Sequence, residues 1–173
     1  MSAISIQYYK APFGELILGA FEGQLCLADY RYRKQRARVD TRLQRGLNAE
    51  YVEAKDPVID AAIAQLQAYD RGQLERFTVP LKLVGTPFQE TVWRALMRVP
   101  YGHTITYLGL AQKIGKPTAV RAVANANGAN CIAVMVPCHR VIGSNGKLVG
   151  YAGGLGAKRR LLMGERNLTL DLG

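Results

Sequence analysis

The sequence predicts an α+β protein with two domains: a small N-terminal α/β domain over residues 1–84 and a mostly helical C-terminal domain over residues 85–173. Short apolar runs separated by turn residues fill the first thirty positions. In the second half, apolar positions recur mostly at helical spacing. The charge also changes, because residues 1–84 carry 12 basic and 10 acidic side chains whereas residues 85–173 carry 11 and 3.

The N-terminal domain is expected to contain a three-stranded antiparallel sheet and one clear helix. The strands are residues 4–9, 15–20 and 24–30. The run Arg31–Arg38 is basic, but acids follow it and few aromatic residues interrupt it, so a solvated helix face is favoured over a nucleic-acid site. Residues 57–69 have the spacing of an amphipathic helix, and residues 77–83 favour a linker strand.

The C-terminal domain begins with a helix-start signal. Thr86 and Gln89 have the spacing of a capping box, and Pro87 suits the first helical position. Two further short helices are expected within residues 104–115 and over residues 118–127, with Gly115 in the break between them. This is the helix-turn-helix pattern, although many helical hairpins bind nothing.

The second of these helices has an exposed face of small residues. Alanine, asparagine and glycine dominate residues 118–128, and Arg121 is the only long polar side chain. A helix that reads the major groove usually carries several long side chains. A small-residue face instead allows the close approach that a narrow minor groove requires. The alternative is that this face packs on another helix.

The last segments are expected to form a strand, a turn and a helix. Residues 132–136 are continuously apolar and favour a buried strand that ends at Pro137. The Asn145-Gly146 pair marks a tight hairpin turn. Residues 155–163 form a final amphipathic helix, with Glu165 just beyond it.

Composition excludes several classes of protein. The chain has 3 cysteines and no Cys-x-x-Cys pair, so neither a disulfide framework nor a zinc site is expected, and a reducing cytoplasm is the natural setting. No apolar stretch is long enough to span a membrane, and the N-terminus lacks the pattern of a secretory signal. The basic second half favours a nucleic-acid partner, with a solvated basic face as the alternative.

Cys138 is the strongest candidate for a reactive group. A thiol is a strong nucleophile only as the thiolate, and His139 and Arg140 follow directly after Pro137, which favours a turn there. A histidine base needs a third group to orient it, and Glu165 is the best candidate because acids are so scarce in this half. The alternative for an isolated cysteine is a small buried apolar residue, which is how we interpret Cys26 and Cys131.

These residues lie in a motif with a clear resemblance. Residues 137–142, Pro-Cys-His-Arg-Val-Ile, resemble the active-site signature of the methylated-DNA–protein-cysteine methyltransferases, the O6-alkylguanine-DNA alkyltransferase family. The resemblance covers about residues 85–168, and the first half is similar only in size and strand pattern. Further motifs match in the same order: Gly85-Thr86-Pro87-Phe88-Gln89, Val92-Trp93, Pro100-Tyr101-Gly102, Thr106-Tyr107, Leu110-Ala111, Arg121-Ala122-Val123 and Gly150-Tyr151-Ala152-Gly153-Gly154.

The resemblance implies a fold and an activity. The N-terminal domain is then ribonuclease-H-like and the C-terminal domain winged-helix-like. The activity is repair by direct reversal: an irreversible, stoichiometric transfer of the alkyl group from O6-methylguanine, and from O4-methylthymine, to the cysteine. The protein would bind the minor groove of double-stranded DNA that contains O6-alkylguanine and flip the damaged base. It would act as a monomer, without a cofactor, a metal ion or a membrane.

The resemblance also assigns roles to residues. Cys138 is the alkyl acceptor, His139 deprotonates it through a water, and Glu165 orients His139. Asn130 braces the hinge beside the active-site turn. Tyr107 gives a proton to the leaving base and also contacts the DNA, where it crowds the backbone phosphate. The other positions implied are the DNA contacts Thr106, Arg121, Ala122 and Ala126 and the pocket residues Val141, Leu148, Tyr151 and Ala152.

Two departures and three rival interpretations accompany the resemblance. Cys131 stands where the family commonly has proline, and Ala152 stands where several relatives have a serine that contacts the guanine oxygen. A non-repairing alkyltransferase-like protein would replace Cys138, commonly with tryptophan. A helix-turn-helix regulator would need base-reading side chains on its second helix. A cysteine hydrolase would need an oxyanion hole and no minor-groove helix.

Overall fold

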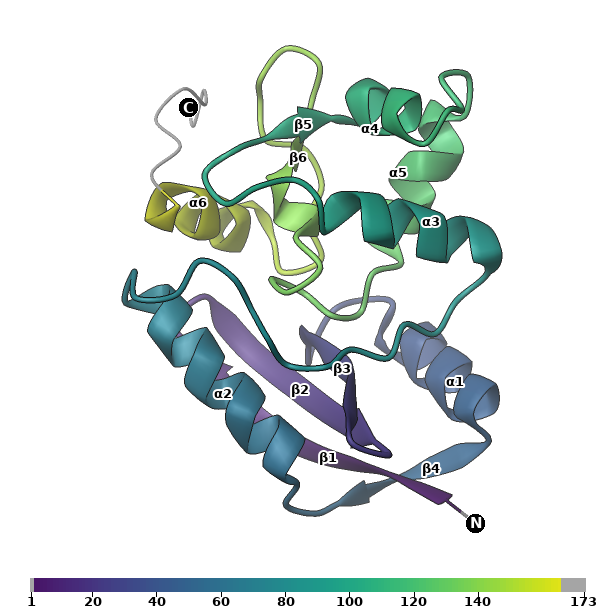
Figure 1. Cartoon of the computed structure of the whole chain (residues 1–173), viewed down its shortest axis with the longest axis vertical. Coiled ribbons are helices and arrows are strands. Elements are labelled where there is room, and N and C mark those ends of the chain that lie inside the picture. Colours follow the sequence, from purple (N-terminus) through teal and green to yellow (C-terminus); the bar gives the residue numbers. More distant parts are fainter. Residues whose placement is uncertain (1, 166–173) are drawn as a thin grey trace. The chain divides into compact units, whose positions relative to one another are not determined.

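The computed structural model describes residues 2–165 and divides into two compact units, Met1–Gly85 and Thr86–Gly173. The first unit consists of a sheet with two helices, and the second is mostly helical (Figure 1). The two parts fold around separate cores, so each is described by itself.

The sheet of the first unit has four strands. Strands β1 (Ser2–Ala11), β2 (Gly14–Phe21) and β3 (Gln24–Tyr30) form the predicted antiparallel meander. The prediction of three strands is nevertheless wrong, because β4 (Ala49–Glu53) pairs with β1 in parallel and gives the order β3-β2-β1-β4. Only Ala49 of this edge strand is buried, so its sequence lacks the apolar alternation that identifies a strand.

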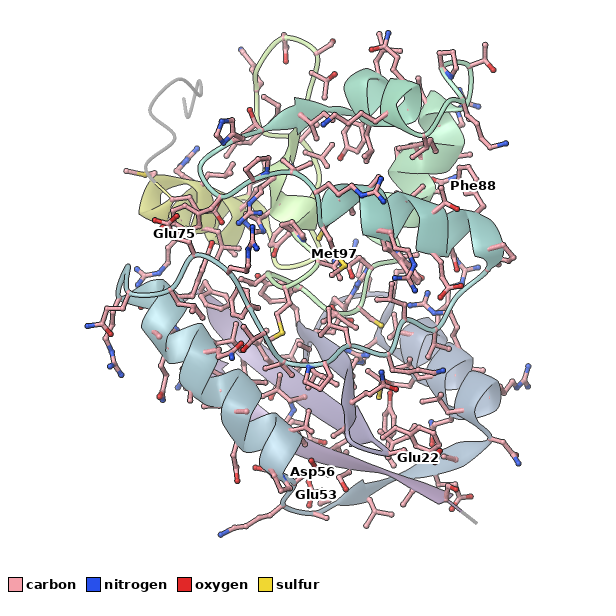
Figure 2. All side chains as sticks on the ribbon, in the orientation of Figure 1. Glu22, Glu53, Asp56, Glu75, Phe88 and Met97 are labelled. Carbon is pink, nitrogen blue, oxygen red and sulfur yellow. The ribbon has the colours of Figure 1, made fainter. Side chains whose placement is uncertain are left out.

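Two helices complete the first unit: α1 (Arg36–Leu47) and α2 (Pro57–Asp70). The Asp56 side chain caps α2 by accepting a hydrogen bond from the Val58 amide at 2.8 Å (Figure 2). The predicted strand over residues 77–83 is wrong. Only an isolated bridge joins Leu81 to Leu25, because Pro80 has no amide hydrogen and cannot continue a ladder.

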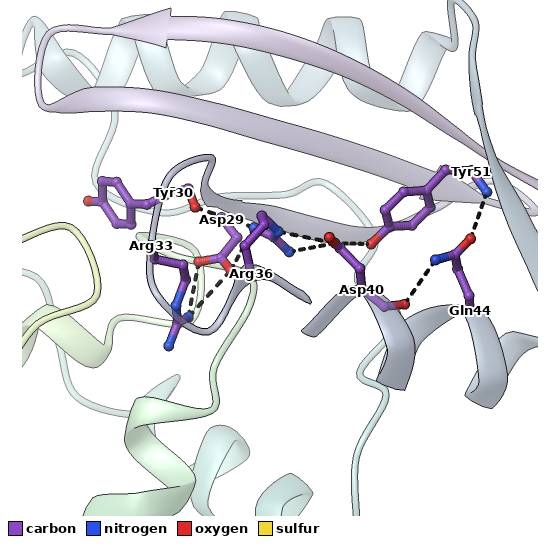
Figure 3. A network of polar contacts seen from close by, with 7 residues as sticks. All are labelled: Asp29, Tyr30, Arg33, Arg36, Asp40, Gln44 and Tyr51. Atoms are coloured by element: carbon purple, nitrogen blue, oxygen red, sulfur yellow. Dashed lines mark hydrogen bonds and ion pairs between the residues drawn. The ribbon is translucent and has the colours of Figure 1, made fainter. Parts of the chain in front are cut away.

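The basic segment before α1 surrounds a buried acid. Asp29 is fully buried at the end of β3, and Arg33 and Arg36 donate to its carboxylate at 3.2 and 2.9 Å (Figure 3). Arg36 also pairs with Asp40, which accepts from the hydroxyl of Tyr51 at 2.6 Å. The interpretation of this run as a solvated face is therefore wrong for the two arginines, which neutralise a buried charge.

Between Thr86 and Glu165, the second unit forms four α-helices: α3 (Pro87–Leu96), α4 (Tyr107–Lys113), α5 (Val120–Gly128) and α6 (Leu155–Gly164). The predicted capping box is present at the start of α3, where Thr86 and Gln89 exchange hydrogen bonds of 3.1 and 3.0 Å. Helix α3 packs against α5, where the Trp93 indole donates to the carbonyl of Ala126 at 2.8 Å. Within residues 2–165, none of the helices combines the length and apolar character that a membrane crossing needs.

Residues 132–136 form a tight buried turn, so the predicted strand is wrong. The Val136 amide donates back to the carbonyl of Ile132 at 2.9 Å, and Val134 adopts the left-handed conformation with φ of 72°. The run is continuously apolar because all of its side chains are buried, a pattern that a buried strand shares. The turn brings the two ends of the segment together next to Cys138.

The segment after Cys138 contains the predicted turn but no hairpin. The Gly143 amide donates to the carbonyl of Lys147 at 2.9 Å, and Gly146 has φ of 81°, as a tight turn requires. The strand before it, β6 (Val141–Ile142), pairs in parallel with β5 (Ile105–Thr106) instead of with residues 148–150. Residues 148–154 thus remain a loop.

Candidate active site around Cys138

Cys138 begins a single turn of 3-10 helix, η1 (Cys138–Arg140), directly after Pro137. The side chain is a reduced thiol with 6% of its surface exposed. The Cys138 amide donates to the carbonyl of Val136 at 2.8 Å. Successive side chains in a 3-10 helix are about 120° apart. Cys138 and His139 therefore do not point to opposite faces, as they would in a strand.

Asn130 holds the turn that leads into Cys138. Its side chain donates to the carbonyl of Val136 at 2.8 Å and accepts from the amide of Ile132 at 3.0 Å. The carbonyl of Val136 thus receives bonds from both Asn130 and the Cys138 amide. Because Asn130 is buried, these bonds fix the backbone at the sulfur against solvent competition.

Glu165 joins a buried cluster with His139 and Arg140. The His139 Nε2 atom is 2.7 Å from Glu165 Oε2. Arg140 donates to both carboxylate oxygens, at 2.9 and 3.0 Å, and to the carbonyl of Val99 at 2.7 Å. The amide of Gly102 also donates to Glu165, at 3.2 Å. The carboxylate therefore accepts four hydrogen bonds from groups far apart in the sequence.

The charges in this cluster favour a neutral His139 beside an ionised Glu165. Burial raises the pKa of Glu165, but the hydrogen bond with His139 and the hydrogen bonds and charge of Arg140 outweigh it, so the pKa lies well below its usual value. Burial lowers the pKa of His139, with a smaller opposing effect from Glu165. Nε2 then carries the proton and donates to Glu165, which leaves Nδ1 as an acceptor. Nδ1 is buried, with no hydrogen-bond partner among residues 2–165.

Lys158 places a buried amine next to this site. Its side chain is fully buried on α6, and Nζ donates to the carbonyls of Val149 and Gly150 at 2.8 and 3.1 Å. Burial lowers the pKa of Lys158 to about 8, against an opposing effect of Cys138. Lys158 therefore fixes the loop after β6 and brings a positive charge toward the sulfur.

Tyr107 also lies close to this loop. It is the first residue of α4, and Thr106 before it caps the helix by accepting from the Gly109 amide at 2.9 Å. A Cβ atom at Gly150 would lie 4.0 Å from the Tyr107 hydroxyl. Burial and the nearby Cys138 raise the pKa of Tyr107, and a hydrogen bond from Asn127 partly offsets this.

The other predicted site residues are divided between surface and core. Arg121 and Ala122 are exposed on α5, whereas Ala126 is buried at 3% exposure and does not share that face. Val141 is fully buried in β6. Leu148, Tyr151 and Ala152 are half-buried in the loop after β6.

Three residues of the site are absent from the sequence-based prediction. The sequence indicates Arg140 only as a neighbour of Cys138, whereas it donates two hydrogen bonds to Glu165. Lys158 precedes the buried Leu161 and Leu162 at helical spacing, and a lysine on an apolar face is the signal that points to it. Asn127 has no comparable signal, since α5 contains a second asparagine that is exposed.

Comparisons with known proteins show which family this chain resembles. Residues 87–167 match the family described as 6-O-methylguanine DNA methyltransferase, DNA binding domain. The methylated-DNA–protein-cysteine methyltransferase of Methanosarcina barkeri is 45% identical over 91% of this chain and 94% of that relative. A crystal structure of Mycobacterium tuberculosis O6-methylguanine methyltransferase has a TM-score of 0.79 and 38% identity, covering 98% of this chain and 97% of that one.

The fold extends to more distant proteins. The O6-methylguanine-DNA methyltransferase of Pyrococcus kodakaraensis has a TM-score of 0.62 at 23% identity, covering 94% of this chain and 98% of that one, which shows a shared fold. The family match covers the segment that holds Cys138, and the similarity to M. barkeri extends over nearly the whole chain. The chain therefore belongs to the methylated-DNA–protein-cysteine methyltransferase family.

Proposed function

We propose that the protein repairs O6-alkylguanine in double-stranded DNA by moving the alkyl group onto Cys138, once per molecule. The observation that carries this proposal is the reduced thiol of Cys138 followed directly by a neutral histidine. Glu165 orients this histidine, since its Oε2 lies 2.7 Å from His139 Nε2. The names of the family's members support the substrate. The product is a thioether, which thiol exchange does not reverse, so each molecule acts once. Because the lesion itself supplies the alkyl group, the reaction needs no methyl-donor cofactor.

The reaction balances with the residues of the site. His139 takes the thiol proton at Nδ1 through a water, and the ammonium of Lys158 favours the thiolate. The sulfur attacks the alkyl carbon, so the S–C bond forms as the C–O6 bond breaks. The electron pair of the broken bond passes into the base, which takes a proton from Tyr107. The His139 imidazolium then returns a proton to the Tyr107 phenolate through solvent, so both residues are restored and the net change is one proton moved from the thiol to the repaired guanine.

DNA binding is assigned to α4 and α5, as a helix-turn-helix of winged-helix type. The exposed Ala122 allows α5 to approach the minor groove closely, and Arg121 fills the space left by the flipped base. Thr106 lies at the start of α4 near the backbone phosphates. A structure of M. tuberculosis OGT in complex with DNA, with a TM-score of 0.79 and 38% identity to this chain, supports this partner.

Two further features remain part of the proposal. O4-methylthymine is a second substrate, since its alkyl oxygen lies on the same edge of a flipped base. The first unit is of ribonuclease-H type, which its three antiparallel strands with a fourth parallel strand support. Tyr151 and Ala152 line the base pocket, where the absence of a hydroxyl at residue 152 leaves backbone amides to contact the guanine oxygen.

The test is a mass measurement after one reaction. The protein is incubated with duplex DNA that contains one O6-methylguanine, and the intact mass and the modified peptide are determined. The expected result is one added methyl group on Cys138, with one lesion repaired per molecule. Cys138→Ala removes the transfer, whereas the matched control Cys131→Ala retains it. No transfer, or transfer that persists in Cys138→Ala, contradicts the proposal.

A further inference from the structure

A tight turn at residues 100–103 lies next to the end of α6. The His103 amide donates to the carbonyl of Pro100 at 3.0 Å, and Gly102 adopts φ of 81°. A type II turn requires a positive φ at its third residue, which glycine adopts without strain. A Cβ atom at Gly102 would also lie 3.3 Å from the backbone carbonyl oxygen of Glu165. The turn and this close approach therefore both favour glycine.

Two hydrogen bonds connect this turn with the end of α6. The Tyr101 hydroxyl donates to the carbonyl of Gly164, the last residue of the helix, at 3.1 Å. The Gly102 amide donates to Oε1 of Glu165 at 3.2 Å. Glu165 is buried at 2% exposure, so water competes little for its carboxylate. The turn thus holds both the end of the helix and the carboxylate that follows it.

The same segment also holds Arg140. The carbonyl of Val99, one residue before the turn, accepts from Arg140 at 2.7 Å. The central guanidinium carbon of Arg140 lies 5.8 Å from the centre of the Tyr101 ring, within the range of a cation–π contact. Arg140 in turn donates to both oxygens of Glu165. Residues 99–102 therefore contact both members of the ion pair that faces His139.

The two oxygens of Glu165 have different partners. Oε1 accepts from the Gly102 amide and from Nε of Arg140, at 3.2 and 2.9 Å. Oε2 accepts from Arg140 at 3.0 Å and lies 2.7 Å from His139 Nε2. Arg140 and His139 belong to η1, whereas the Gly102 amide comes from outside η1. Because it is a backbone group in a tight turn, this amide fixes the carboxylate independently of any side-chain rotamer.

We propose that Gly102 is a positioning residue that sets the tautomer of His139 through Glu165. Its amide holds Oε1, so that Oε2 faces the imidazole and keeps the proton on Nε2. Nδ1 is then left with a lone pair for the thiol proton. The inference rests on the proposed function for the consequence of this arrangement, which is that a displaced Gly102 amide slows alkyl transfer.

The histidine tautomer can be measured directly in solution. The chain has 2 histidines, so a two-dimensional NMR spectrum with nitrogen-15-labelled histidine contains two ring patterns, and His103→Asn assigns them. In the natural chain at pH 7 we expect His139 to carry its proton on Nε2. Gly102→Ala disfavours the positive φ and adds a Cβ atom against the backbone of Glu165. This variant is expected to give a mixture of both tautomers.

The same variant is expected to slow repair. Single-turnover transfer from duplex DNA with O6-methylguanine should fall about tenfold in Gly102→Ala, a fraction of what a general base contributes. Retention of the Nε2 tautomer in Gly102→Ala overturns the proposal. A mixture of tautomers with transfer at the natural rate overturns it as well, because positioning of the histidine would then have no effect on the reaction.

Gly72→Ala is the matched control for backbone strain. Gly72 has φ of 74°, and a Cβ atom there would meet no atom of the described residues within 4 Å. The control therefore introduces similar strain far along the chain from Glu165. It should retain the Nε2 tautomer and the natural rate of transfer. If Gly72→Ala changes both as much as Gly102→Ala does, general destabilisation is the cause and the proposal is wrong.

Gly102→Asn covers the case in which Gly102→Ala does not fold. Asparagine tolerates a positive φ better than alanine, but its Cβ atom still meets the Glu165 backbone. We expect mixed tautomers and slower transfer, and a natural tautomer in Gly102→Asn contradicts the proposal. The NMR measurement needs no DNA. If the natural chain adds no methyl group to Cys138, the proposed function fails while the tautomer still decides the role of Gly102.

Discussion

Arg140 determines how His139 works, although Glu165 is the residue that touches the imidazole. A buried carboxylate with histidine as its only cationic partner would favour the imidazolium, which has no lone pair available for a proton. Arg140 neutralises Glu165 through two hydrogen bonds of 2.9 and 3.0 Å. Burial lowers the pKa of His139 most and the charge of Arg140 adds to this effect, so His139 remains neutral and the lone pair of Nδ1 stays available for a proton.

Lys158→Met is expected to weaken the thiolate of Cys138. The pKa of Lys158 is lowered to about 8, so its ammonium is present below that pH and is lost as the pH rises through it. At pH 7 the variant should react with iodoacetamide about tenfold more slowly than the natural chain, because a positive charge near the sulfur is gone. Above pH 9 the two rates should converge.

The control for Lys158→Met is Arg159→Met, which removes an exposed charge from the same helix. Alkylation rates measured from pH 6 to 10 provide the comparison. A ratio of rates between Lys158→Met and the natural chain that does not change with pH would show that Lys158 acts only by holding the carbonyls of Val149 and Gly150.

At the scale of elements, the sequence predicted helices better than strands. The helices α2, α3 and α6 have caps, apolar stripes or both. These local features identify each helix from its own residues, and the structure contains all three helices. The edge strand β4 was missed because its pairing with β1 is not local and it buries one residue. Residues 132–136 were misinterpreted because burial on all sides gives the same apolar run in a turn as in a strand.

In the candidate site, too, the local features were predictable and the non-local contacts were not. Cys138 and His139 were predictable because they are adjacent, and Glu165 because acids are scarce around it. The hydrogen bonds of Arg140 with Glu165 and of Lys158 with the carbonyls of Val149 and Gly150 depend on how separate segments pack, and no spacing in the sequence encodes them.

Arg36→Ala is expected to destabilise the first unit by about 2–3 kcal/mol. The substitution leaves Asp29, which is fully buried, with Arg33 as its remaining partner in Figure 3. Arg38→Ala, which removes an exposed arginine of the same helix, should change the free energy of unfolding by less than about 0.5 kcal/mol. Urea denaturation of both variants measures the difference, and equal stabilities would show that the Asp29–Arg36 pair contributes nothing.

At the scale of the whole molecule, the charge is concentrated in the second half. Residues 85–173 carry 11 basic and 3 acidic side chains, and several of the basic ones are exposed around the turn between α4 and α5. A basic surface binds DNA largely by releasing counterions from phosphates. The proposed DNA affinity should therefore depend strongly on salt, with little contribution from the nearly balanced first half.

Replacing both Lys113 and Lys116 by Gln should weaken DNA binding and its salt dependence. The slope of log K against log salt is expected to fall in magnitude by about 1–2, at roughly 0.9 for each phosphate that is no longer neutralised. The control pair, Lys10→Gln with Lys55→Gln in the first unit, removes the same charge and should leave the slope unchanged. Fluorescence anisotropy over a salt series gives the slope for each variant. If the Lys113/Lys116 variant has the same slope as the natural chain, the DNA does not contact the turn between α4 and α5.

The position of Glu165 in the chain has a consequence for synthesis. Its carboxylate binds Arg140, which precedes it by 25 residues, and the amide of Gly102, which precedes it by 63. Under the proposed function, a chain that stops short of residue 165 would contain Cys138 and His139 but lack the carboxylate that orients the imidazole. Alkyl transfer is therefore expected only after α6 and Glu165 have been synthesised.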